Sequence, residues 1–176
     1  MNAPQKTTGA VVIRKAGKAD QPRIFKLLEQ VNMHHIPSAE MPGLTFENYY
    51  VAMVNDKVAG FCGYKILSAT TAKTELMVVD RAYRGLGIGY RLQEFRMTEM
   101  LQRGIELLTT NTDRPQTIAW YKKHFGYKQV GTLKKAHPFG DPDIGTWQTL
   151  QVNLQDWAAQ NQTRSRPPDG STKTRK

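Results

Sequence analysis

The sequence predicts one α/β domain with a central mixed sheet of about six or seven strands and helices on both faces. Residues 49–79 contain three consecutive strand-like runs, a pattern typical of an antiparallel meander. A Gly-rich loop and an amphipathic helix then lead to another buried strand, as in a parallel βαβ crossover. Two further strand-like runs close the sheet.

The first elements are a short strand and a helix. Residues 11–13 are Val-Val-Ile, which favours a strand. Asp20 has the residue type of a helix N-cap, and Pro22 suits the first helical turn. Apolar residues then follow at helical spacing, so we expect this helix to end at about Glu29 or Val31.

The meander follows an irregular stretch that contains two prolines, residues 33–45. Alternating residues predict a strand over 49–54 that ends at a hairpin turn, Asn55-Asp56. The return strand is expected over 58–67 and a third strand over 71–79.

The second half begins with the Gly-rich loop, residues 80–89, and a long helix behind it. Apolar and β-branched runs, a proline at a helix start and a glycine at a helix end predict the remaining elements. These are a strand, a helix and two strands, over 105–110, 115–126, 127–133 and 146–154.

The charge divides the chain into a domain and two ends. The net charge is +10, from 25 Lys and Arg against 15 Asp and Glu, which suggests an anionic partner. From residue 158 onward five basic residues accompany one acidic residue and almost no apolar ones. We therefore expect a flexible arm (1–10), one domain (11–155) and a disordered basic tail (156–176).

Composition also excludes some classes of protein. Cys62 is the only cysteine, so no internal disulfide forms, and its apolar strand favours a small buried side chain over a reactive thiol. The N-terminus lacks a signal-peptide core, and no run of 18 apolar residues occurs. We expect a cytoplasmic protein that neither crosses nor binds a membrane.

The Gly-rich loop is the clearest functional signal. It joins a strand to a helix and carries three alternating glycines, Gly85, Gly87 and Gly89. Glycine permits positive φ and close approach of a ligand to the backbone. Amides in such a turn, at the positive end of the next helix, bind phosphate groups. Three arginines add charge there: Arg81, Arg84 and Arg91.

Two common phosphate-binding motifs do not fit this loop. A Gly-x-Gly-x-x-Gly motif that starts at Gly85 would need glycine at position 90, which is Tyr90. The Walker loop needs Gly-Lys-Ser/Thr at its end, and the chain has none here. The loop instead resembles the Arg/Gln-x-x-Gly-x-Gly/Ala signature of the GNAT family of acyl-CoA-dependent N-acetyltransferases, with Arg-Gly-Leu-Gly-Ile-Gly at 84–89.

The resemblance extends beyond the loop. The preceding Val-x-x-x-Tyr-Arg-Gly run is present, and the order of elements fits from about Val11 to Leu154. It implies a GNAT-like fold and acetyl-CoA as co-substrate, with pyrophosphate on the loop amides and pantetheine along the strand before it. The residues implied for the cofactor are Met77, Val78, Val79, Arg84, Gly85, Leu86, Gly87, Ile88, Gly89, Tyr90, Asn111 and Lys123.

Two residues are the catalytic candidates. The resemblance makes Glu75, four residues before Val79, the base that takes the amine proton, directly or through water. It makes Tyr121 the acid that protonates the departing thiolate, although one extra residue separates it from the next glycine. The alternative interpretations are a solvent-facing glutamate in a strand and a core aromatic side chain.

The acceptor pocket is implied in two segments, those after the first helix and between the last two strands. Their candidate residues are His34, His35, Glu40, His137 and Asp141. The alternative interpretation of Asp141 is a turn residue beside Pro142. His124 is expected on the surface of a helix. No metal site is predicted, because His34 and His35 are adjacent and lack further ligands at suitable spacing.

These observations predict an enzyme that acetylates a primary amine, of a small molecule, in a ternary complex. The alternatives are acetylation of a protein N-terminus or lysine, and a non-catalytic acyl-CoA sensor. Nucleic acid is not an expected partner, because no basic strand with interleaved aromatic residues or recognition helix is present. A homodimer is common in the family.

Overall fold

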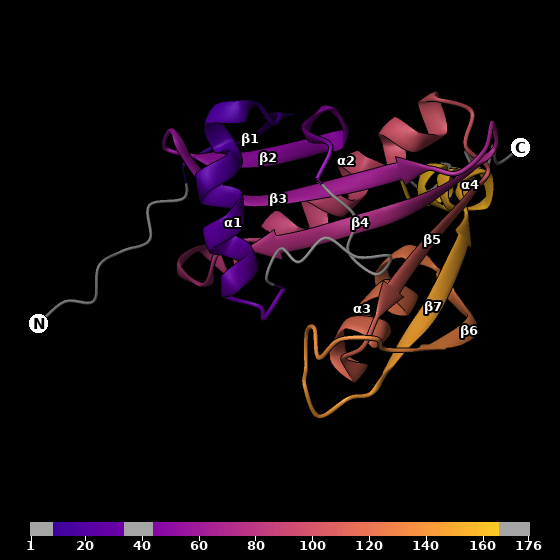
Figure 1. Cartoon of the computed structure of the whole chain (residues 1–176). Helices are drawn as coiled ribbons and strands as arrows, with labels where there is room; N and C mark the ends of the chain where they lie inside the picture. Colours follow the sequence, from indigo (N-terminus) through magenta and orange to yellow (C-terminus); the bar gives the residue numbers. More distant parts are fainter. Residues whose placement is uncertain (1–8, 34–43, 166–176) are drawn as a thin grey trace, which may run out of the picture.

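A computed structural model describes residues 9–33 and 44–165 of the chain (Figure 1). These form a seven-stranded sheet, four helices and short 3-10 turns. The strands are β1 (Val11–Lys15), β2 (Tyr49–Val54), β3 (Lys57–Ile66), β4 (Thr71–Val79), β5 (Leu107–Thr112), β6 (Lys128–Lys134) and β7 (Thr146–Asn153). The helices are α1 (Gln21–Glu29), α2 (Ile88–Gln102), α3 (Pro115–Phe125) and α4 (Leu154–Ser165).

The sheet is mixed, as predicted, in the order β1-β2-β3-β4-β5-β7-β6. Every neighbouring pair is antiparallel except β4 and β5. These two parallel strands pair only over Thr71–Lys73 and 107–109, and beyond that point they diverge (Figure 1). The sheet is therefore open at the carboxyl ends of its two central strands.

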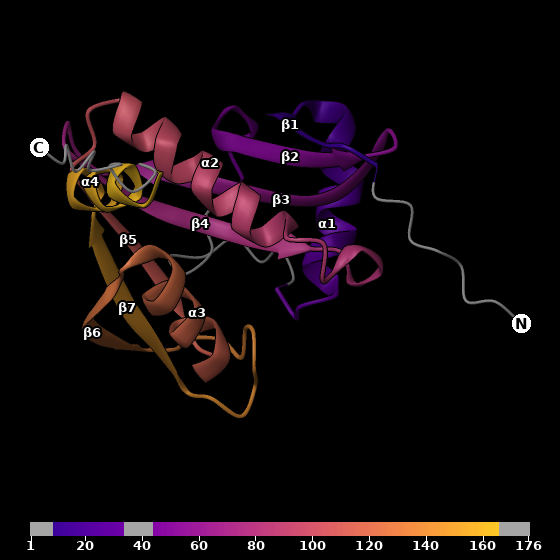
Figure 2. The same ribbon diagram turned by 180° about the vertical axis from the view of Figure 1, so that it is seen from behind.

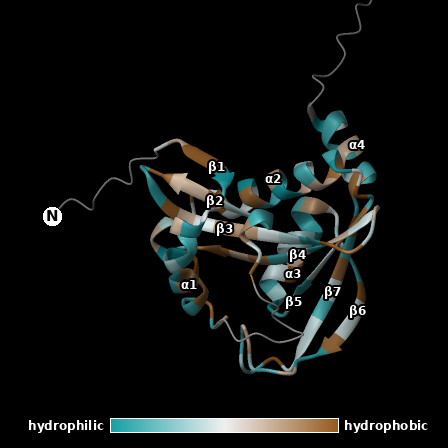
Figure 3. Ribbon diagram, turned by 45° about the horizontal axis from the view of Figure 1, so that its top comes forward, coloured by the Kyte–Doolittle hydropathy of each residue, from teal (hydrophilic) through white to brown (hydrophobic). Residues whose placement is uncertain are grey.

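Helices cover both faces of the sheet. Helix α1 lies on one face, and Figure 2 shows α2, α3 and α4 on the other. The buried side chains divide in the same way into a cluster under α1 and a larger cluster under α2 and α3. Hydrophobic colour follows β1, β2 and β3, whereas the helices carry much hydrophilic colour (Figure 3).

The predicted turns are confirmed by their backbone angles. Asn55 and Asp56 have φ of 48° and 61°, the left-handed conformation of a two-residue hairpin turn. Gly126 ends α3 with φ of 69°. Cys62 is completely buried, and burial raises the pKa of its thiol to about 11, which confirms the inert interpretation.

The prediction of disorder from residue 156 onward is wrong for the first part of the tail. Helix α4 continues to Ser165, well beyond the expected domain end. Leu154 and Trp157 are buried in the larger core cluster, and their burial stabilises a helix that its polar composition alone does not predict. No described helix is long and apolar enough to span a membrane.

We expect Trp157→Ala to lower the free energy of unfolding by about 3 kcal/mol, because it leaves a cavity where α4 meets the core. Urea unfolding measures the change. Gln155→Ala, which alters an exposed side chain on the same helix, is the control and should change stability by less than about 0.5 kcal/mol. Equal effects of the two substitutions would contradict the packing of α4 on the core.

Candidate active site

A β-bulge in β4 shapes the centre of the site. Met77 pairs with Cys62 and Glu75 pairs with Gly63, so Leu76 is an extra residue on β4. The guanidinium of Arg96, on α2, is almost fully buried and donates to the carbonyls of Gly63 and Glu75, each at 2.9 Å. These bonds occupy carbonyl groups at the bulge and fix its shape.

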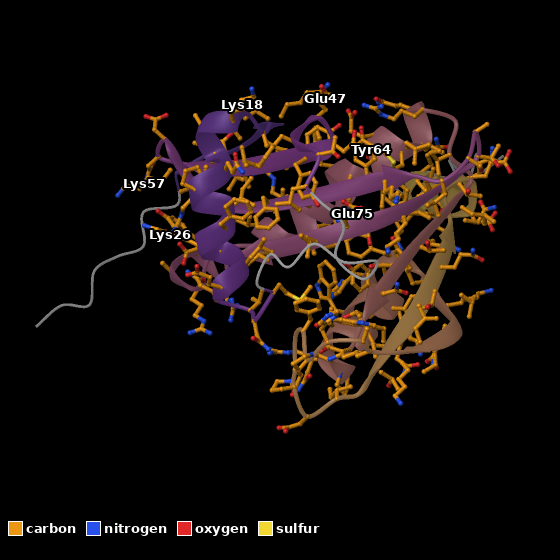
Figure 4. All side chains as sticks on the ribbon, in the orientation of Figure 1. Lys18, Lys26, Glu47, Lys57, Tyr64 and Glu75 are labelled. Carbon is orange, nitrogen blue, oxygen red and sulfur yellow. The ribbon has the colours of Figure 1, made fainter. Side chains whose placement is uncertain are left out.

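A cavity of about 730 Å³ lies where β4 and β5 diverge. Its lining combines β4 residues 73–78, the end of β5, part of α3 and the segments that follow α1 and β6. Predicted site residues meet there: Glu75, Tyr121, and the β4 residues Met77 and Val78, whereas Val79 at the end of β4 is not in the lining. Figure 4 shows Glu75 midway along β4.

Glu75 is held by a hydrogen bond from Tyr49. The hydroxyl of Tyr49 on β2 donates to the Glu75 carboxylate at 2.9 Å, across the intervening strand β3. The Tyr49 ring passes over Gly63, where an added Cβ would lie only 2.6 Å from the ring. Burial, followed by the charge of Glu75, raises the pKa of Tyr49 far above its usual value, so Tyr49 stays a hydrogen-bond donor.

Tyr121 enters the cavity from α3. It is buried, and its ring lies 5.0 Å from the rings of Trp120 and Tyr127. These contacts fix the ring while the residue lines the cavity. The extra residue before Gly126 therefore does not keep Tyr121 out of the site.

The Gly-rich loop has the backbone that the sequence predicts. Gly85 and Gly87 have φ of 82° and 74°. An added Cβ at either position would meet no atom within 4 Å, so the conformation, and not lack of space, requires glycine there. Gly87 is the N-cap of α2, and the loop amides therefore lie at the positive end of that helix.

The start of the loop is tied to the end of α1. Asp80 accepts hydrogen bonds from Arg23, Gln30 and the amide of Ala82. Burial opposes ionisation, but these hydrogen bonds outweigh it and hold the pKa of the Asp80 carboxyl below its usual value. Arg81 donates to the Gln30 carbonyl at 2.7 Å, so its side chain joins α1 instead of extending freely from the loop.

A buried ion pair shapes the loop between β6 and β7. The Lys135 ammonium donates to Asp113 at 2.9 Å and also to the carbonyls of Phe139 and Asp141. The Asp113 carboxylate also accepts from the amide of Asp141 at 2.7 Å. These bonds to Asp113 and Lys135 fix the segment after β5 against the loop between β6 and β7.

Some predicted residues meet in the cavity and others lie elsewhere. Those in its lining are Glu75, Met77, Val78, Arg84, Asn111 and Tyr121. The remaining loop residues lie beside it at the start of α2, and Lys123 is exposed on α3 outside the lining. His34, His35 and Glu40 lie outside the described residues.

The loop between β6 and β7 contributes to the cavity, but through residues other than the predicted ones. Ala136 and Gly140 line the cavity, whereas His137 and Asp141 do not. The Asp141 carboxylate instead accepts from the amide of Asp143, as in the turn interpretation. No group of metal-ligating side chains occurs among the described residues.

Sequence reasoning missed Tyr49, Arg96 and Asp113. The glycine at position 63, inside a strand, was a signal of close approach by another group. Arg96 lies midway between Leu92 and Met100 on the buried stripe of α2, which indicates a buried cation. Asp113 gave no such signal, because its partner Lys135 is 22 residues away.

Comparison with known proteins gives the following matches. The sequence model of the Acetyltransferase (GNAT) family matches residues 23–127. No curated protein matches the chain in sequence. Similar solved structures are Ard1 from Thermoplasma volcanium (TM-score 0.68, 18% identity, 82% of this chain and 97% of that chain) and the ribosomal-protein-S18-alanine N-acetyltransferase from Escherichia coli (0.67, 20%, 82% and 94%).

A third similar structure contains the cofactor. It is the N-acetylglutamate synthase from Neisseria gonorrhoeae, complexed with coenzyme A and N-acetyl-glutamate. Its TM-score is 0.66 at 16% identity, over 83% of this chain and 35% of that chain. At such identities these structures share the fold of the present chain.

We expect Lys135→Met to lower the free energy of unfolding by about 3 kcal/mol or more, because it leaves the buried Asp113 carboxylate without its cation. Thermal and urea unfolding measure the loss. Lys128→Met, an exposed lysine on β6, is the control and should be nearly neutral. If Lys135→Met were as stable as this control, the ion pair would not fix the loop.

Proposed function

The chain belongs to the GNAT acetyltransferase family, whose co-substrate is acetyl-CoA, and we propose that it acetylates the primary amine of a small molecule. The amine attacks the thioester directly in a ternary complex. The observation that carries this proposal is the shared cavity of Glu75 and Tyr121 beside the phosphate-binding loop. A base, an acid and a cofactor site are thereby available to one reaction centre.

The proposed chemistry assigns a role in proton transfer to each residue. Glu75 takes a proton from the ammonium, directly or through water, and leaves a nucleophilic amine. The amine nitrogen bonds to the thioester carbon, and a backbone N–H of β4 stabilises the oxyanion. As the carbon–sulfur bond breaks, Tyr121 gives its proton to the CoA thiolate, and the attacking nitrogen gives its second proton to the Tyr121 phenolate, directly or through water. The products are the N-acetyl amine and CoA, and Glu75 releases the first proton to solvent.

A bridge across the acceptor side supports a small acceptor. The side-chain amide of Asn32, just after α1, donates to the carbonyls of Pro138 and Gly140, and the Gly140 amide donates to the Asn32 carbonyl. Together they join the two segments that border the cavity opposite the helices α2 and α3. Such a bridge favours a compact amine over an extended peptide.

We expect acetyl-CoA to raise the melting temperature, because the loop amides bind its pyrophosphate in the folded state alone. NAD and ATP are the comparison ligands, and neither should match this shift.

Tyr121→Phe should lower turnover by about 10²-fold while the shift with acetyl-CoA stays nearly unchanged. Thiol release with a panel of amines measures turnover. Unchanged turnover in Tyr121→Phe would remove this residue from the acid role.

We expect Tyr49→Phe to lower kcat about tenfold, because it removes the hydrogen bond that holds the Glu75 carboxylate in the cavity. Thiol release with a reactive amine measures kcat. Gly63→Ala should act similarly, because a Cβ there displaces the Tyr49 ring.

Tyr50→Phe is the matched control for this experiment. Tyr50 is also buried, and its hydroxyl also lies near a glutamate, Glu99, at 3.2 Å, but outside the cavity lining. Tyr50→Phe should leave kcat unchanged. An equal loss of kcat in both variants, or no loss in either, would show that the Tyr49 hydroxyl does not hold Glu75 for the reaction.

A further inference from the structure

Among the described residues, more cations than carboxylates line the cavity. Five basic residues contribute to it: Lys73, Arg84, Arg96, Arg114 and Lys134. The acidic residues in this described lining are Glu75 and Asp113. This balance is opposite to what a purely cationic acceptor would need.

Some of these charges already have partners. Arg96 is directed at main-chain carbonyls and Gln93, and Arg84 belongs to the phosphate-binding loop. Asp113 is compensated by Lys135 and by a backbone amide. Among the described residues, the remaining basic side chains Lys73, Arg114 and Lys134 form no ion pair.

Lys73 lies close to the catalytic candidate Glu75. The two residues are separated by one position on β4, so their side chains share a face of the sheet about 7 Å apart along the strand. Six residues, or about 20 Å of strand, separate Lys73 from Val79 at the phosphate loop. Lys73 is therefore placed for the acceptor end of the cavity and not for the cofactor's pyrophosphate.

A second lysine lies directly opposite Lys73. Lys65 on β3 pairs with Lys73 in the antiparallel register, which places both side chains on the same face. Like charges in directly opposite positions destabilise a sheet. Lys65 is exposed and lies outside the cavity lining, whereas Lys73 lines it, so an anion bound at Lys73 would reduce that repulsion.

The other two cations lie at the end of β6 and just beyond β5. Lys134 is the last residue of β6 and pairs with Thr146 on β7. Arg114 follows the end of β5 by two residues and is the N-cap of α3. Both side chains line the same cavity as Lys73.

We propose that the acceptor is an amine that also carries an anionic group, a carboxylate or a phosphate, and that Lys73 binds this group beside Glu75. The inference rests on the proposed acetylation of an amine. Glu75 faces the ammonium while Lys73, assisted by Arg114 and Lys134 for larger acceptors, neutralises the anion. Polyamines, which carry only positive charge, are repelled from this lining.

Matched pairs of amines test the proposal. Thiol release from acetyl-CoA is measured with phenylalanine against phenethylamine, with phosphoethanolamine against ethanolamine, and with putrescine. We expect kcat/KM to be at least about tenfold higher for the member of each pair that carries the carboxylate or phosphate. The two pairs separate a carboxylate from a phosphate as the preferred group. A preference for the members without an anionic group, or for putrescine, would overturn the proposal.

Two variants assign the effect to a residue. Lys73→Gln should lower kcat/KM about tenfold for the amine that carries the anionic group, so that its advantage over the matched amine without that group is lost, while the KM for acetyl-CoA does not change. Lys57→Gln makes the same charge change at the exposed start of β3, outside the cavity lining, and should alter none of these values. Equal losses in the two variants, or equal losses for both amines, would overturn the role of Lys73.

Calorimetry separates failure of this inference from failure of the proposed function. If no amine releases thiol, the proposed acetylation of a small amine is wrong. Binding of the same amines to the CoA complex then decides the anion site independently. Binding of the anionic members that is weakened by Lys73→Gln supports the site, whereas absent or unchanged binding overturns it.

Discussion

The buried guanidinium of Arg96 is the constraint on which the site depends. It reaches from α2 to the carbonyls of Gly63 and Glu75 and so stabilises the bulge in β4. The bulge lies just beyond the three residues through which β4 pairs with β5. The cavity opens in this divergence, with the backbone of β4 on one wall. In the proposed reaction, this cation in the cavity lining would also contribute positive potential near the negative charge that forms on the oxyanion.

The two faces of the sheet supply different parts of the proposed chemistry. Tyr49, from the core under α1, reaches across Gly63 to hold Glu75. Tyr121 comes from the core under α2 and α3. The opening between β4 and β5 lets residues of both cores line one cavity. Tight packing around each tyrosine limits its motion, which suits groups that must meet the thioester in a fixed geometry.

The sequence charge pointed first to an anionic partner, and the fold divides that charge among several roles. Arg84 belongs to the Gly-rich loop, and Arg81 is directed to α1. Lys135 forms a buried ion pair with Asp113, while Lys73 lines the cavity with Glu75. Asp141, a carboxylate expected near the acceptor, is not in the cavity lining. Charge counts predict an anionic ligand, but only side-chain partners decide which cations remain to bind it.

The sequence by itself determined the order of strands and helices as far as β7, the αL glycines of the Gly-rich loop and the family, because these follow from local periodicity, turn chemistry and a short motif. It could also nominate Glu75 and Tyr121 by resemblance. Only the tertiary structure brought these two to one cavity, buried Arg96, ordered α4 on the core and joined Tyr49 to Glu75. Those features depend on contacts between residues far apart in the chain, and local patterns do not encode such contacts.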